Sequence, residues 1–568
     1  MKTILYCLAA GLLLPLRCRM PAAGNQRNAY HYQAVKAISV PHGAVVSAHP
    51  LASQAGLHIL REGGNAIDAA IATQFALAVV YPLAGNIGGG GFMVIHTQTG
   101  KNTTIDYRET APGQASRDMY LDSAGNADPE KSRNGALAVG VPGTVAGLFL
   151  AHERYGKLPM ATLLQPAIDL AAKGYVLTAR SAAALNHAQP AFKKYNSRTP
   201  VFVKPGDWQA GDTLVQKDLA GTLQRIQQKG AAGFYGGKTA RLIVEEMQRS
   251  GGIISLADLK QYRAVERTAR QFDYKGYQIV SMPLPSSGGI LLQQMLGMLS
   301  AYPVGDYGFE SAKAVQLMVE IERRAYADRA LYLGDPDFNQ VPVAQLTAAA
   351  YLKSRMADFR FGQAGSSDAI AAGQFPEHEE TTHLSVMDSA GNAVAVTYTL
   401  NNVYGSKVVV GGAGFVLNDE MDDFSAKPGA PNMFGLLGAE ANAIAPGKRM
   451  LSSMTPTLVL QEGQPVMVLG SPGGATIITS VFQTLVDVID FHLPLEQAVN
   501  APKFHHQWKP DLIYIEKGFP DSVQTTLEQM GYHFRTRSPI GRTDVILKKG
   551  DTLHAVADGR GDDSAAGY

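Results

Sequence analysis

Residues 381–400 read Thr-Thr-His-Leu-Ser-Val-Met-Asp-Ser-Ala-Gly-Asn-Ala-Val-Ala-Val-Thr-Tyr-Thr-Leu. Residues 382–388 and 393–400 each alternate along the chain, which is typical of two strands with one buried face. A three-residue loop joins them, and Gly391 stands where such a loop needs a left-handed residue. The stretch therefore predicts an antiparallel hairpin in which Thr381 faces Thr399, with Cβ atoms roughly 5 Å apart.

This pair of hydroxyls has two interpretations. One is an ordinary cross-strand threonine pair, which is common in sheets. The other is a nucleophile, Thr381, with a second hydroxyl beside it. The preceding residues 361–380 are rich in Gly, Ala, Ser and acidic side chains and carry no period, so we expect a mobile loop there. The hairpin alone leaves both interpretations open.

Upstream of the hairpin, the pattern predicts helices packed on an antiparallel sheet, an α+β arrangement. Asn65 is expected to cap a helix over 66–80 whose small apolar side chains on every side indicate burial. The middle of the chain, about 145–360, is expected to be mostly helical. The other expected elements are strands at 43–48, 92–97 and 102–108 and a helix at 51–61.

Composition excludes several classes of protein. The 568 residues include 50 Lys and Arg against 49 Asp and Glu, a net charge of +1, which argues against nucleic-acid binding. Hydrophobic residues make up 46% and charged residues 17%, which suits a packed core rather than a disordered chain.

The first residues are typical of a secretory signal peptide. Lys2 precedes an apolar run at 4–16, and small residues follow at 22–24. We assign the signal peptide to 1–23; the alternative is a retained anchor. The two cysteines, Cys7 and Cys18, both lie in this segment. Its removal would leave no disulfide, thiol nucleophile or thiolate metal site.

Residues 380–386 together with 393–401 closely resemble the gamma-glutamyltranspeptidases, a family of N-terminal-nucleophile hydrolases. The resemblance covers nearly the whole chain after about residue 40. Further segments that carry it are 64–70, 88–91, 107–112, 140–143, 418–424, 451–457, 470–474, 504–508 and 566–568.

The resemblance implies a four-layer αββα sandwich of the N-terminal-nucleophile hydrolases. It also implies an inactive precursor that cuts itself between Glu380 and Thr381, giving a heterodimer of a large subunit (24–380) and a small subunit (381–568). Thr381 then serves as nucleophile, and its freed α-amino group, with an ordinary pKa of about 7.7–8.0, serves as general base. Thr399 orients the nucleophile. No metal or organic cofactor is implied.

The remaining site residues follow from the resemblance and from charge. Gly473 and Gly474 supply an oxyanion hole through their N–H groups; taken alone, they are ordinary turn residues. Taken alone, Arg108 would be expected to form a surface salt bridge with Glu109 or a neighbour. The 422–423 aspartates would be expected in a solvated turn or at a helix cap. By resemblance, the donor's α-carboxylate binds Arg108, Ser452 and Ser453, and its ammonium binds Asn401, Glu420 and Asp423.

One segment nearly matches a zinc-protease motif. His378 and His383 are five residues apart rather than the four that a zinc-protease helix needs, so we reject a metal site.

Phe434 stands where many bacterial family members have a tyrosine in the loop over the pocket, here 426–438. The tyrosine hydroxyl that helps to latch the lid in those members is therefore missing, which leaves the balance of hydrolysis against transfer open. Because Asp423 is retained, we favour γ-glutamyl over glutaryl donors.

The expected protein is a periplasmic or secreted γ-glutamyltransferase and glutathione hydrolase. Its expected partners are glutathione and other γ-glutamyl compounds as donors, and water, amino acids or dipeptides as acceptors. Nucleic acid and a stable membrane span are not expected. Two alternatives remain: a related acylase or poly-γ-glutamate depolymerase, and a processed but catalytically silent binding module.

Overall fold

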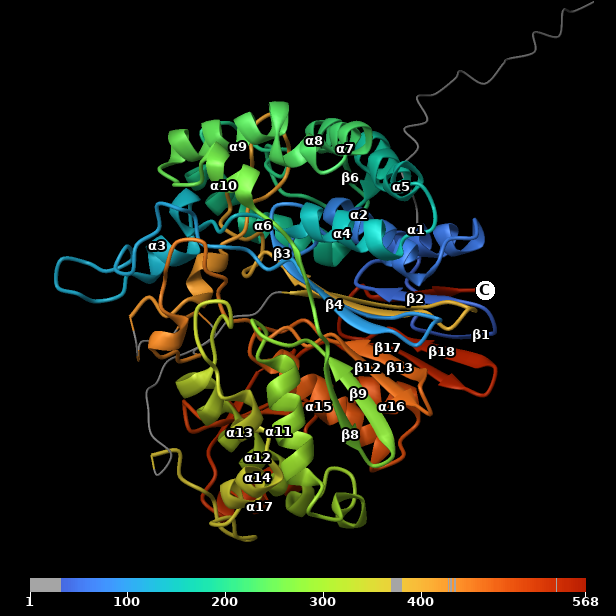
Figure 1. Ribbon diagram of the computed structural model, residues 1–568, viewed down its shortest axis with the longest axis vertical. Helices are drawn as coiled ribbons and strands as arrows, with labels where there is room; N and C mark the ends of the chain where they lie inside the picture. Colours follow the sequence, from blue (N-terminus) through green and yellow to red (C-terminus); the bar gives the residue numbers. More distant parts are fainter. Residues whose placement is uncertain (1–31, 369–380, 428, 430–431, 434–435, 538) are drawn as a thin grey trace, which may run out of the picture.

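Two seven-stranded sheets lie face to face in the computed structural model, and helices cover their outer faces (Figure 1). The structure describes residues 32–368, 381–427, 429, 432–433, 436–537 and 539–568. This is the predicted αββα sandwich, an α+β fold. The first sheet contains, in spatial order, β1 (Ala37–Val40), β18 (Thr552–Val556), β17 (Asp544–Lys549), β13 (Gln464–Gly470), β12 (Thr457–Gln461), β9 (Tyr277–Ser281) and β8 (Arg270–Tyr274). The second contains β19 (Ser564–Gly567), β2 (Ala44–Ser47), β10 (Thr382–Met387), β11 (Ala393–Thr399), β3 (Gly90–His96), β4 (Asn102–Asp106) and β7 (Val265–Arg267).

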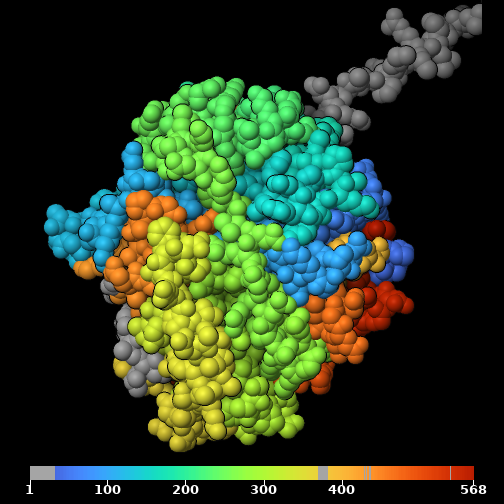
Figure 2. Space-filling model, in the orientation of Figure 1, coloured from blue at the N-terminus to red at the C-terminus, as the bar shows by residue number. Residues whose placement is uncertain are grey.

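Helices form the two outer layers, and Figure 2 shows those of 217–261 and 312–355 at opposite ends of the molecule. Helices of the layer near the second sheet include α1 (Pro50–Arg61), α2 (Ala66–Val80), α4 (Thr144–Tyr155), α5 (Met160–Lys173), α6 (Ala179–Tyr195), α7 (Lys217–Lys229), α8 (Ala232–Tyr235), α9 (Gly237–Ser250) and α10 (Leu256–Gln261). Those near the first sheet include α11 (Gly288–Leu299), α12 (Ala312–Tyr332), α13 (Val343–Leu346), α14 (Ala349–Arg355), α15 (Thr476–Ile489), α16 (Leu495–Asn500) and α17 (Asp521–Gln529). No helix among the described residues is both long and apolar enough to cross a bilayer.

The predicted hairpin is confirmed as β10 and β11. Thr382 pairs with Tyr398 and Met387 with Ala393, the expected register. Gly391 has φ +88°, the left-handed conformation that the three-residue loop requires. Both strands are buried along their length, because one face packs on α2 and the other on the opposite sheet.

Helix α2 also agrees with the sequence analysis. All of its side chains are buried, as its small apolar residues predict. Asn65 and Asp68 form a capping box, in which each side chain accepts a hydrogen bond from the other residue's backbone N–H, at 2.9 and 3.1 Å. The helix is thereby fixed at its start and lies against the nucleophile hairpin.

The glycine run at 88–91 brings backbones close together. A Cβ on Gly89 would lie 2.2 Å from the carbonyl oxygen of Thr399, and one on Gly91 would lie 2.4 Å from the Cβ of Tyr398. Any side chain here would push β3 away from β11, so the run sets the position of Thr399.

The middle of the chain is mostly helical but also contains β7, β8 and β9, which the sequence analysis missed. Lys275 and Gly276 form the turn between β8 and β9, with φ of +47° and +83°. A two-residue turn of this kind joins hairpin strands, so this glycine was the available signal. Each sheet contains strands from both sides of residue 380, so the two parts of the chain share both sheets of the core.

The prediction of a mobile loop at 361–380 is wrong for residues 361–368. Ser367 is fully buried, and its N–H donates to Asp511 Oδ2 at 2.8 Å. Trp508 Nε1 donates to the carbonyl of Ser367 at 3.2 Å, and Arg323 donates to its hydroxyl. Residues 369–380, like the predicted signal peptide, lie outside the described residues.

Candidate active site

The predicted site residues converge at one end of the sandwich, where strands of both sheets begin or end. Thr381 directly precedes β10, Thr399 ends β11, Arg108 follows β4, and Gly474 follows β13. Residues far apart in sequence thus meet around one pocket. It is lined by Arg108, Thr381, Thr399, Asn401, Glu420, Asp423, Ser452, Ser453, Met454, Gly474 and Ile477.

The threonine pair is held firmly. Thr381 and Thr399 are each 3% exposed. The hydroxyl of Thr399 accepts a hydrogen bond from the N–H of Asn401 at 2.8 Å, and its carbonyl accepts one from Asn86 Nδ2 at 2.8 Å. Thr399 therefore has a fixed hydroxyl at the position that the hairpin register places opposite Thr381.

Gly473 and Gly474 form the turn that leads from β13 into α15. Their φ angles of +134° and +54° favour glycine at both positions. Thr476 closes the turn by donating its N–H and hydroxyl to the carbonyl of Gly473, at 3.0 and 2.8 Å. Within the described residues, neither glycine N–H donates to another group. Gly474 lines the pocket and Gly473 precedes it in the turn, so this turn offers free donors to an oxyanion.

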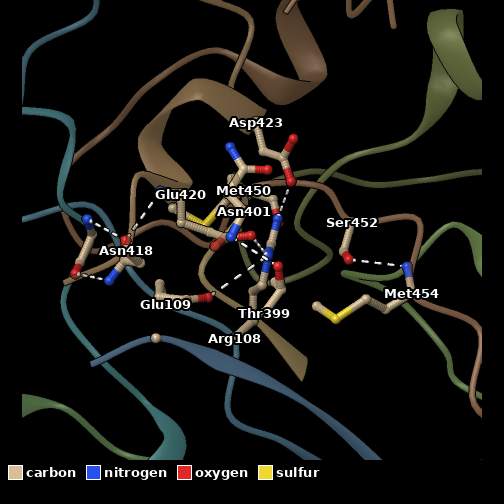
Figure 3. Close-up of polar contacts among 12 residues, drawn as sticks. Arg108, Glu109, Thr399, Asn401, Asn418, Glu420, Asp423, Met450, Ser452 and Met454 are labelled. Carbon is tan, nitrogen blue, oxygen red and sulfur yellow. Dashed lines mark hydrogen bonds and ion pairs between the residues drawn. The ribbon is translucent and has the colours of Figure 1, made fainter. Parts of the chain in front are cut away.

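Arg108 lies at the centre of the charged half of the pocket (Figure 3). Its guanidinium is fully buried and forms ion pairs with Glu420 and Asp423, while Glu109 Oε2 lies 3.7 Å from Nη1. The alternative of a surface ion pair is therefore wrong. One arginine faces three acidic side chains here.

These acids are poised to accept a cation. Burial raises the pKa of Glu420 to about 8, although Arg108 opposes the shift, and Glu420 Oε2 has no hydrogen-bond partner among the described residues. Burial also raises the pKa of Asp423. Burial raises the pKa of Glu109 far above its usual range. Among the described residues, neither carboxylate oxygen of Glu109 has a hydrogen-bond partner. An arriving ammonium would relieve this excess of acid.

Asn401 lines the pocket and is held in the left-handed region, with φ +78°. Its Nδ2 donates to the carbonyl of Asp419 at 3.1 Å and to Met433 Sδ at 3.4 Å. Two further hydrogen bonds hold the loop that contains Met433. Met433 N–H donates to Asp422 at 2.7 Å, and Asn432 Nδ2 donates to Asp423 at 2.9 Å. Phe434 lies outside the described residues, so the prediction for the lid is not tested.

Ser452 and Ser453 also line the pocket. Ser452 Oγ accepts from the N–H of Met454 at 3.1 Å, and Ser453 Oγ accepts from Arg329 Nη2 at 3.1 Å. The sequence analysis missed Arg329, as well as the inward position of Glu109. No local signal marks Arg329, because α12 carries charged residues that read as a solvated face but are buried.

Three buried histidines outside this pocket have polar partners. His383 lies between the sheets, with ring nitrogens 2.8 Å from Thr397 Oγ1 and 3.0 Å from Ser385 Oγ. His505 lies 2.8 Å from Thr479 Oγ1, and His506 lies 3.2 Å from Asp511. Among the described residues, no group of three or more His, Cys, Asp or Glu side chains could hold a metal ion.

The pocket bordered by the described residues is small, with a volume of about 20 Å³, room for about one water molecule. Arg108 and its ion-pair partners Glu420 and Asp423 line this pocket together with Thr381.

Comparison with known proteins gives a consistent result. The model of the gamma-glutamyltranspeptidase family matches residues 52–568. A glutathione hydrolase proenzyme of Escherichia coli strain K12 is 48% identical over 93% of this chain and 92% of its own. Among solved structures, a cephalosporin acylase from Bacillus halodurans has a TM-score of 0.82 at 26% identity, covering 95% of this chain and 98% of its own. A Helicobacter pylori gamma-glutamyltranspeptidase chain is 44% identical with a TM-score of 0.57, covering 61% of this chain and 99% of its own.

Proposed function

The chain belongs to the gamma-glutamyltranspeptidase family, and we propose that it is a glutathione hydrolase and γ-glutamyltransferase that matures by cleavage between Glu380 and Thr381. One observation carries the proposal: Thr381 borders the pocket that is also lined by a buried arginine, two acids and two serines. A nucleophile that lies beside both an arginine and carboxylates suits an acyl donor that carries both a carboxylate and an ammonium group.

Maturation begins with the hydroxyl of Thr381 attacking the carbonyl carbon of Glu380. The peptide nitrogen of Thr381 leaves, and water hydrolyses the resulting ester. This frees the α-amino group that later acts as base. Thr399, held by Asn401, lies where it can orient the attacking hydroxyl. The same oxygen thus cuts the chain once and then serves each catalytic cycle.

In the catalytic cycle, the donor's carboxylate binds Arg108 and the two serines, and its ammonium binds Glu420 and Asp423. Thr381 Oγ attacks the γ-carbonyl carbon while its amine takes the proton. The N–H groups of Gly473 and Gly474 stabilise the oxyanion. The C–N bond breaks, cysteinylglycine leaves with the proton, and water or an amino acid or dipeptide then takes the γ-glutamyl group from Thr381.

The acid cluster favours a γ-glutamyl donor over a glutaryl one. A glutaryl group lacks the ammonium, so its binding would leave Glu420 and Asp423 buried without a new cation. This separates the proposal from an acylase of the cephalosporin type. A depolymerase acting on poly-γ-glutamate remains the second candidate, since its substrate has the same linkage.

The location is also part of the proposal. A charged residue, an apolar run and small residues at the start of the chain support export through a signal peptide at 1–23, to the periplasm or the medium. Fractionation of cells that produce the full chain tests this: the shortened protein should leave the cytoplasm, and retention of an uncut chain in the cytoplasm would contradict it.

The test of the activity combines a denaturing gel with N-terminal sequencing. The small fragment should begin Thr-Thr-His-Leu-Ser, and the mature protein should release product from a γ-glutamyl anilide faster than from a glutaryl anilide. Thr381→Ala should give one uncut and inactive chain. A Thr381→Ala protein that still turns over the anilide would overturn the mechanism, and a normal chain that never cleaves would favour the silent binding module.

A further inference from the structure

Arg329 is a buried cation whose partners are hydroxyl groups. It lies in the last turn of α12 and is 5% exposed. Its Nε donates to Ser287 Oγ at 3.0 Å and its Nη2 to Ser453 Oγ at 3.1 Å. The described residues give it no ion pair. Burial lowers the pKa of Arg329 to about 10, so it stays charged at neutral pH.

Arg108, by contrast, is already matched by carboxylates. Glu420 and Asp423 bind it directly, and Glu109 lies 3.7 Å away. A carboxylate entering the pocket therefore meets an arginine whose charge is compensated. Arg329 is a nearby cation that forms no ion pair among the described residues, although Asp423 lies near enough to favour its charged form. Ser453, which lines the pocket, accepts a hydrogen bond from it.

The hydrogen bond from Arg329 fixes how Ser453 can act. Because the serine oxygen accepts from the guanidinium, its own hydrogen is left to point elsewhere as a donor. A charge-assisted bond also polarises that hydroxyl, so it becomes a stronger donor to an anion. Ser453 would thus transmit the positive charge of Arg329 into the pocket.

A second route reaches Ser452. Ser287 accepts from Arg329 and donates its hydroxyl to the carbonyl of Ser452 at 2.7 Å, and its N–H donates to the same carbonyl at 2.8 Å. Ser452 N–H in turn donates to the carbonyl of Pro285 at 2.9 Å. Arg329 is therefore linked to both serines of the pocket by hydrogen bonds. It bonds Ser453 directly, and it reaches the carbonyl of Ser452 through Ser287.

We propose that Arg329 is a positioning residue that makes the Ser452–Ser453 segment selective for donors carrying an α-carboxylate. The proposal rests on the function given above, because it needs that carboxylate to bind the two serines. Its effect is on recognition of the donor, and the nucleophile and its base are untouched.

The test compares three anilides on mature enzyme: γ-glutamyl, glutaryl, which keeps the carboxylate, and 4-aminobutyryl, which keeps the ammonium. Arg329→Gln should raise the KM for the γ-glutamyl and glutaryl donors about tenfold, the loss of roughly one charge-assisted hydrogen bond. The KM for the 4-aminobutyryl donor and all kcat values should change less than twofold. Arg329→Lys, which keeps the charge, should recover part of the affinity.

The matched control is Arg270→Gln, since Arg270 also bonds uncharged groups, Gln293 Oε1 at 2.6 Å and Thr347 Oγ1 at 3.0 Å, away from the pocket. It should leave all three KM values unchanged. If Arg329→Gln disturbs folding, Ser287→Ala provides the second variant and should raise the same two KM values. Equal changes for all three donors, or none, overturn the proposal. Failure of wild-type enzyme to cleave the γ-glutamyl anilide instead overturns the function itself.

Discussion

Replacing Asp423 by Asn separates recognition of the donor's ammonium from recognition of its carboxylate. Asp423 is held by Arg108 and by Asn432 Nδ2 at 2.9 Å, and its side chain is 10% exposed. The substitution keeps the shape and removes one negative charge. Arg108 keeps its ion pair with Glu420, so the buried arginine remains compensated and the fold should survive.

The expected size follows from the lost interaction. A hydrogen bond to a charged group contributes about 1.5–3 kcal/mol, which corresponds to about 10- to 150-fold in kcat/KM. The γ-glutamyl anilide should lose this factor. The glutaryl anilide has no ammonium, so its kcat/KM should stay the same or rise as the repulsion between the pocket acids falls.

The assay measures kcat and KM for both anilides on mature protein, with maturation checked on a gel. Asp337→Asn is a suitable control, because Asp337 also pairs with an arginine, Arg267, but its side chain is 49% exposed and lies outside the pocket lining. Equal losses on the two donors would refute the assignment of Asp423 to the ammonium. An unchanged γ-glutamyl rate would refute it as well.

Three other substitutions test separate parts of the structure. Gly474→Ala places a side chain at φ +54° beside the nucleophile, so kcat should fall about 10²-fold with little change in KM, and an unaltered kcat would remove this turn from the oxyanion hole. Burial lowers the pKa of His383 to about 3, so the stability that it contributes is present above pH 6.5 and is lost as the pH falls. The difference in unfolding free energy between wild type and His383→Asn should therefore shrink between pH 7 and pH 4.5, and a constant difference in denaturant titrations would contradict this. Asp511→Asn removes an acceptor of the Ser367 N–H, so trypsin should cut faster after the exposed Arg360, whereas unchanged cutting would show that the other bonds of Ser367 suffice.

Local patterns predicted the nucleophile hairpin and the buried helix beside it. Alternation fixes which residues of a strand share a face, and Gly391 fixes the loop, so the register that places Thr381 opposite Thr399 follows from neighbours in sequence. The capping of α2 by Asn65 is equally local. The sequence analysis failed for 361–368, where polar, small residues suggested mobility but partners more than 100 positions away hold Ser367.

The sequence by itself therefore determined the family, the hairpin and the identity of the residues around the nucleophile. Only the tertiary structure decided how their charges combine: that Arg108 is matched by Glu420 and Asp423, and that Arg329 reaches Ser453 across 124 positions of sequence. The physical reason is that strand and helix periods encode which face a side chain occupies. They carry no information on which distant element packs against that face, and in a buried site that packing sets the charge of every group.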